Sequence, residues 1–210
     1  MQAPTTESAQ PLSPDMNAQA RHSQLLDQFV ACWQKLDGHD LRESIDDLSF
    51  SLPFDSPLRA DDHHWRPLQL ATDRSMLEAV YAKLPARFPP LYEELVLSYR
   101  WLEVDLQRYR LHSNPPGADL SGVLGRILKD KFLSGFLLKN GYIPFGKGGD
   151  MDYDPVCFDL KARKKNREFE IVKIDHEEIL CNERIRVVAK LAHSFEELVL
   201  QTIQLAAKPA

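Results

Sequence analysis

Hydrophobic positions follow a helical period in the first two thirds of the chain and a strand period after that. Before Gly141 they recur every three or four residues, and beyond it they alternate along short segments. Helices that precede sequential strands, followed by one closing helix, predict an α+β fold. We expect the helices to pack on one face of a largely antiparallel sheet, with an N-terminal helical and irregular extension before this domain.

The N-terminal extension is predicted to have two parts. Residues 1–20 are rich in Pro, Ser, Gln and Thr and carry almost no large apolar side chains, so we expect a disordered tail. Residues 21–71 contain one predicted helix and an irregular, proline-containing arm. The helix has an apolar face formed by Leu25, Leu26, Phe29, Val30, Trp33 and Leu36. We expect the arm to pack on the main domain through Phe50, Phe54 and Trp65.

The main domain is predicted to span residues 72–210 and to begin with three helices. A capping-box pattern at Ser75 and Glu78 opens the first helix. A pair of prolines opens the second helix, whose apolar positions continue to Leu106. The third helix is expected over residues 119–139, with an inward face formed by Leu120, Val123, Leu124, Ile127, Leu128, Phe132 and Phe136.

Three strands and a closing helix are predicted for the rest of the domain. Alternating apolar positions place the strands at residues 156–160, 169–174 and 184–191. The basic segment 161–167 is expected to form the tip of a hairpin between the first two strands. Ser194 and Glu197 form a second capping box, which predicts a final helix with Phe195 on its apolar face.

Composition narrows the class of protein. The chain has 210 residues, of which 27% are charged and 43% hydrophobic, values typical of a globular protein. It contains no run of 18 apolar residues and starts without a secretory leader pattern, so we expect no membrane span and a cytoplasmic location. The net charge of −5 does not favour nucleic-acid binding. The three cysteines are far apart and indicate neither a disulfide framework nor a thiolate zinc site.

Several short motifs resemble catalytic or metal-binding patterns but lack a required residue. Residues 141–147 match G-x-x-x-x-G-K, yet Gly148 follows where a phosphate-binding loop needs Ser or Thr. The H-E-x-x pattern in residues 176–180 ends in Leu180 where zinc binding needs a second His. Residues 150–154 space three aspartates as in a calcium loop, but a proline occupies the glycine position of that loop. We therefore predict no catalytic residue, no cofactor and no metal site.

The segment after Gly141 has the composition of a partner-binding surface. Aromatic and charged side chains stand next to one another there, as they do in protein interfaces. We expect an acidic loop and an acidic turn to face a protein partner, with the candidate contacts Met151, Asp152, Tyr153, Asp154, Asp175, His176, Glu177 and Glu178. If that partner is basic, these carboxylates would speed the encounter.

Two other classes of function remain as alternatives. A metal-dependent enzyme or factor is the first, provided that the fold brings together Asp150, Asp159, Asp175 and His176. The second is a nucleic-acid binder that uses the basic segment 161–167, whose affinity would fall steeply with salt.

Four segments of the chain, in the expected order, resemble the SUKH superfamily of Smi/Knr-type proteins. Leu84-Pro85 together with residues 91–95 resembles the opening helix of that superfamily. Residues 140–160 resemble its glycine and aspartate loop with the following strand. Residues 171–178 resemble the next strand and acidic turn, and residues 192–198 the closing helix with its SFEEL sequence.

This resemblance implies an α+β fold with helices on one face of a sheet, and it implies no catalysis. Bacterial members are commonly immunity proteins that bind and neutralise toxins, whereas fungal members are scaffolds in cell-wall and signalling control. The residues that carry the structural motif are Gly141, Pro144, Gly148, Gly149, Asp159, Ser194, Phe195 and Glu197. The implied function is therefore that of a protein-binding module.

Overall fold

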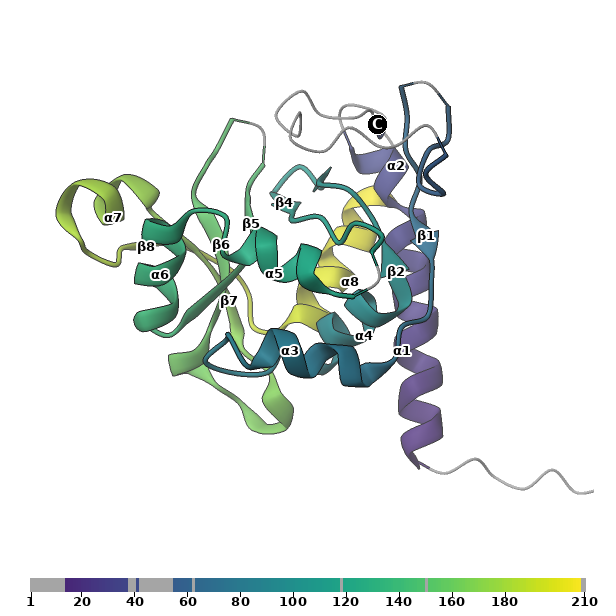
Figure 1. Ribbon diagram of the computed structural model, residues 1–210, viewed down its shortest axis with the longest axis horizontal. Helices are drawn as coiled ribbons and strands as arrows, with labels where there is room; N and C mark the ends of the chain where they lie inside the picture. The colour runs from purple at the N-terminus through teal and green to yellow at the C-terminus, as the bar shows by residue number, and fades with distance from the viewer. Residues whose placement is uncertain are drawn as a thin grey trace, which may run out of the picture.

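A six-stranded antiparallel sheet forms the centre of the molecule (Figure 1). A computed structural model describes residues 14–37, 41, 55–61, 63–117, 119–149 and 151–208. The strand order follows the chain, so that each strand pairs with the next one along the sequence. The predicted α+β fold with a largely antiparallel sheet is confirmed.

The strands that follow residue 141 occur close to the predicted positions, with one addition. The sheet consists of β3 (Val104–Asp105), β4 (Tyr109–Leu111), β5 (Tyr142–Gly148), β6 (Pro155–Asp159), β7 (Glu170–Ile174) and β8 (Val187–Ala192). A separate two-stranded sheet pairs β1 (Leu68–Gln69) with β2 (Tyr99–Arg100). Strand β5 was not predicted, because its glycines and Pro144 are unusual in a strand interior. The strand accommodates them through a register shift against β6 between Pro144 and Gly146.

Eight α-helices surround the sheet in the part of the chain that the structure describes. They are α1 (Pro14–Ala31), α2 (Trp33–Leu36), α3 (Leu77–Tyr81), α4 (Pro90–Ser98), α5 (Ser121–Ile127), α6 (Lys131–Lys139), α7 (His176–Asn182) and α8 (Phe195–Ala206). Short 3-10 turns occur at Arg74–Met76, Leu160–Ala162 and Lys165–Arg167. Because α1 begins at Pro14, it includes the end of the segment expected as a tail, and residues 1–13 lie outside the described residues.

The first two predicted helices of the main domain are shorter than expected. Helix α4 ends at Ser98 because Tyr99 pairs with Gln69 in the small sheet. The helical spacing of apolar residues, which continues to Leu106, therefore predicted a helix that is too long. The predicted capping box at Ser75 was wrong. The carboxylate of Asp73 accepts from the Ser75 amide and opens the 3-10 turn before α3 instead.

The third predicted helix is two helices, α5 and α6. Asp130 separates them, because its side chain accepts from the Leu133 amide at 2.8 Å and caps α6. Phe132, expected to face inward, is 49% exposed. The apolar period therefore identified helical structure but missed the break and the change of direction that follows it.

Helices pack on both faces of the sheet, whereas the sequence led us to expect one. Val156 and Phe158 of β6 belong to the large core, which also contains buried side chains of α1, α4 and α8. Cys157, between them, points to the other face and packs with Leu137 of α6 and Ile179 of α7 in a smaller core. Cys157 is thus a buried apolar side chain, and burial raises the pKa of its thiol.

The N-terminal helix belongs to the large core. Phe29 and Trp33 are fully buried, and the ring of Phe29 packs edge-on against that of Phe195 in α8. Trp65 of the arm is also buried, as predicted, while Phe50 and Phe54 lie outside the described residues. Among the helices described, none combines the length and apolar character needed to cross a membrane.

Candidate functional site

Asp154 joins the acidic loop, defined here as residues 151–154, to the start of α7. Its Oδ1 accepts from the His176 amide at 2.9 Å and lies 2.8 Å from His176 Nδ1. Asp152 in turn accepts from the Asp154 amide at 2.9 Å and from Lys173 Nζ of β7 at 2.5 Å. The loop and the turn, separated by about twenty residues in sequence, therefore form one continuous surface.

Most of the predicted contact carboxylates are already bonded within the chain. Asp175 is the N-cap of α7, accepts from the Glu178 amide at 2.9 Å and pairs with Arg186. The Glu178 hydrogen bond is the main cause of the lowered pKa of Asp175. Burial alone would raise the pKa of Asp152, but the hydrogen bonds from Lys173 and the Asp154 amide, together with the nearby positive charges, lower that pKa. These carboxylates organise the surface more than they present free negative charge to a basic partner.

Three large apolar side chains are exposed on this surface. Met151 is 72% exposed, Tyr153 50%, and Leu180 on α7 51%. The Tyr153 ring lies edge-on to the His176 ring at 6.4 Å between centroids, and Lys147 Nζ lies 5.6 Å from the Tyr153 centroid. Large apolar side chains held in place beside charged groups are typical of energetically important interface positions.

A groove adjoins Tyr153 and Leu180. It has a volume of about 570 Å³, within the range of pockets that bind ligands or side chains. Residues of α5, α6, β5, the acidic loop and α7, and of the turn between α5 and α6, contribute to its lining. The lining residues are Glu103, His112, Arg126, Ile127, Lys129, Asp130, Leu133, Ser134, Leu137, Pro144, Gly146, Lys147, Tyr153, Pro155, His176 and Leu180.

Glu103 forms a polar cluster in the lining of this groove. Lys147 Nζ lies 2.9 Å from Glu103 Oε1, and His112 Nδ1 lies 3.9 Å from Oε2. Burial alone would raise the pKa of Glu103, but the hydrogen bonds and positive charges of His112 and Lys147 lower it to about 2. The Glu103 side chain is therefore ionised at neutral pH, and it neutralises Lys147.

The groove residues that lie outside the acidic segments were not predicted from the sequence. Glu103 fell within a predicted helix, and Leu180 appeared only as the residue that breaks a zinc motif. A local pattern carries no signal for either position, because the groove forms only when residues of α5, α6, β5 and α7 come together.

The three described members of the alternative metal cluster, Asp159, Asp175 and His176, are not brought together. Asp159 pairs with Glu170 at the start of β7, whereas Asp175 and His176 follow the end of that strand. The Asp159 carboxylate accepts from the Lys161 amide at 2.9 Å, which caps a 3-10 turn. Asp150 lies outside the described residues. Within the described part of the chain, no three His, Cys, Asp or Glu side chains are grouped as metal ligands.

The motif residues shape the sheet and its connections. Gly141 has φ = +81°, a conformation that favours glycine, and it turns the chain from α6 into β5. Pro144 and Gly148 lie in β5, and the Gly149 carbonyl accepts from the Asp152 amide. At the start of α8, Ser194 accepts from the Glu197 amide, so the predicted N-cap is confirmed. Glu197 accepts from the amide of His193 and not from that of Ser194, so the reciprocal bond of a capping box is shifted by one residue.

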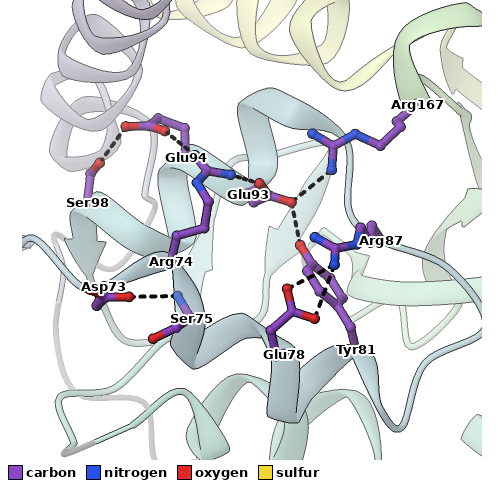
Figure 2. A network of polar contacts seen from close by, with 10 residues as sticks. All are labelled: Asp73, Arg74, Ser75, Glu78, Tyr81, Arg87, Glu93, Glu94, Ser98 and Arg167. Carbon is purple, nitrogen blue, oxygen red and sulfur yellow. Dashed lines mark hydrogen bonds and ion pairs between the residues drawn. The ribbon is translucent and has the colours of Figure 1, made fainter.

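A second polar cluster surrounds Glu93 on α4 (Figure 2). The Glu93 side chain is only 2% exposed and is paired with Arg74 and, at 3.0 Å, with Arg167. Tyr81 Oη donates to Glu93 Oε2 at 2.6 Å. All three partners are thus oriented around one buried carboxylate, which ties α4 to α3 and to the segment between β6 and β7.

The basic segment 161–167 connects β6 to β7, as predicted for a hairpin tip. Several of its cations have partners within the molecule. Arg167 pairs with Glu93, Lys164 donates to the His193 carbonyl at 2.9 Å, and Lys161 lies over the Tyr142 ring. These contacts attach the segment to the domain and leave fewer of its positive charges available for a nucleic acid.

In comparisons with known proteins, no protein-family model and no curated protein matches this chain. The SUKH relationship therefore stays a prediction based on the four sequence segments.

Proposed function

We propose that this chain is a non-enzymatic, cytoplasmic protein-binding module that uses the acidic loop, the start of α7 and the adjoining groove. One observation carries the proposal. Two segments distant in sequence are joined through Asp154 and His176, and together they expose Met151, Tyr153 and Leu180 beside a groove. Apolar anchors on a preorganised surface lose little entropy on binding, which suits recognition of a folded partner.

The SUKH resemblance suggests what such binding achieves. We propose that the partner is a toxin domain that the chain neutralises, as in immunity proteins, or a protein that it organises as a regulatory scaffold. Neutralisation predicts that co-expression of the chain protects cells from its partner. If the chain forms a stable complex with its partner but does not protect the cells, the result would favour the scaffold role.

The proposal is tested by capture with surface variants. The immobilised chain is exposed to a lysate of its source cells, and retained proteins are identified by mass spectrometry. The double variant Tyr153→Ser and Leu180→Ser should weaken the recovered complex by roughly tenfold or more, since buried anchors dominate interface energies. Leu70→Ser removes a comparably exposed leucine on a distant segment and should bind as the unaltered chain does. Equal retention by the double variant would refute this surface as the binding site.

A further inference from the structure

We infer that the groove binds a short segment of the protein partner in which apolar side chains flank a carboxylate. This inference rests on the proposed function and adds the chemistry of the bound segment. It differs from the sequence-based expectation of a basic partner, and its support comes from the lining of the groove.

The apolar part of the groove would hold the apolar side chains of such a segment. Leu133 and Leu137 of α6 and Pro144 and Pro155 of the sheet line the groove, and Tyr153 and Leu180 add apolar surface that is half exposed. A volume of about 570 Å³ accommodates a few side chains and does not require the groove to open. Burial of these side chains would supply most of the binding free energy.

The charge of the lining favours an anion. Three cationic side chains line the groove, from Arg126, Lys129 and Lys147, against the two carboxylates of Glu103 and Asp130. Glu103 and Lys147 neutralise each other at 2.9 Å. The formal charge of the lining is +1 with its histidines neutral, although the whole chain has a net charge of −5. Arg126 has an interaction of its own within the protein, so Lys129 is the cation that can attract an anion.

Lys129 is the cation best placed to meet a carboxylate. It is exposed in the turn between α5 and α6, and its ammonium group has no ion pair or hydrogen bond with any residue that the structure describes. The nearby Asp130 uses Oδ1 to cap α6 at the Leu133 amide. A carboxylate bound beside Leu133 would thus pair with Lys129 and displace no existing ion pair.

The inference is tested with three acetylated and amidated hexapeptides, SLFDLS, SLFNLS and SLFKLS, titrated into the full chain. Two-dimensional NMR of the amide groups follows binding up to about 5 mM peptide, where contacts with millimolar Kd are visible. We expect shifts at Leu137, Tyr153 and Lys129, with the Asp peptide bound roughly threefold to fivefold more tightly than the Asn peptide. The Lys peptide should bind most weakly, and added salt should reduce the difference.

Two variants separate the charge effect from a structural one. Lys129→Gln should abolish the preference for Asp over Asn, whereas Lys139→Gln, an exposed lysine at the other end of α6, should preserve it. Equal binding of the three peptides, a preference for the Lys peptide, or no shift in the groove would each overturn the inference. The capture experiment is independent of these outcomes, because it asks whether any partner binds at Tyr153 and Leu180.

Discussion

At the scale of single residues, the buried acids of this protein stabilise the fold through specific partners. Glu93 is the clearest case, because its carboxylate is almost fully buried and is bonded to two arginines and a tyrosine. Removing one member of a buried ion pair leaves the opposite charges uncompensated, which is usually more destabilising than the loss of an exposed pair.

We therefore predict that Glu93→Gln lowers the free energy of unfolding by about 1.5–3 kcal/mol, the usual value of hydrogen bonds to a charged group, since both arginines keep access to solvent. The isosteric amide preserves volume but leaves Arg74 and Arg167 without their common negative charge. Glu94→Gln on the same helix, which loses a longer contact of 3.4 Å to Arg74, should cost less than about 1 kcal/mol. Urea unfolding followed by circular dichroism measures both. Similar losses for the two variants would contradict the prediction.

Glu103 predicts a pH dependence of stability. Its pKa is about 2 in the folded protein against 4.5 as the usual value, so the unfolded chain takes up a proton before the folded chain does. The stabilisation from its ionised form is complete above pH 4.5 and is lost as the pH falls through 2. It amounts to about 3 kcal/mol, since one pKa unit corresponds to about 1.4 kcal/mol.

The variant Glu103→Gln isolates this contribution from those of the other acids. We expect the difference in unfolding free energy between the original chain and the variant to shrink as the pH falls from 5 to about 2. Urea unfolding at a series of pH values measures that difference. A difference that stays constant over this range would show that Glu103 titrates normally in the folded protein.

At the scale of elements, replacement of a glycine by alanine is expected to have opposite effects on stability in strand β5 and in helix α6. A Cβ built on Gly146 of β5 would lie 2.3 Å from the Arg110 carbonyl oxygen of β4, a contact that requires the backbone to move. A Cβ on Gly135 of α6 meets nothing within 4 Å. The same substitution should therefore disrupt one element and strengthen the other.

We predict that Gly146→Ala destabilises the protein by about 1–3 kcal/mol or more, because β4 and β5 must separate to accommodate the methyl group. Gly135→Ala should stabilise it by about 0.5–1 kcal/mol, since alanine has the better helix propensity. Thermal unfolding compares the two variants directly. A stabilised Gly146→Ala variant would mean that the approach of β4 to β5 is looser than the structure describes.

The outer strand β8 illustrates how an element can be protected from unwanted pairing. Its register against β7 shifts twice, between Ile171 and Val172 and between Lys173 and Ile174. Such bulges twist an edge and make it a poor template for a further strand. Val187 and Val188 of β8 are exposed at 44% and 41%, so these bulges protect an edge that carries apolar side chains.

At the scale of the whole molecule, the N-terminal helix is part of the main core. Helix α1 packs against α4 and α8, and α2 contributes Trp33, which contacts Trp101 edge-on at 5.8 Å. The predicted division at residue 72 separates these segments in sequence, but the large core includes side chains from both sides of that division.

We predict that Phe29→Ala lowers the free energy of unfolding by about 3–5 kcal/mol, the usual effect of removing a fully buried phenylalanine. A chain that starts at residue 72 should bind hydrophobic dyes, because Phe195 and Trp101 lose their cover. Arg21→Ala in the same helix removes only an exposed ion pair with Glu196 and should cost less than about 1 kcal/mol. A residue 72–210 chain with unchanged stability would restore the predicted domain boundary.

The sequence by itself determined the features that depend on local chemistry. The N-cap of α8 at Ser194, the strands β6 and β7, and the burial of Cys157 followed from patterns a few residues long. Strand β5 and the end of α4 were not predictable, because Pro144 is tolerated only at a bulge and Tyr99 leaves the helix to pair with β1.

Only the tertiary structure decided the groove and the pairing of the candidate carboxylates. Glu103 and Leu180 are far apart in sequence, and the ion pairs of Asp152 and Asp175 involve residues on other elements. Local patterns report how a segment folds, whereas charge neutralisation and concave surfaces depend on which segments become neighbours. The sequence could therefore indicate which segments combine exposed apolar and charged side chains, but not which of those charges are paired within the fold.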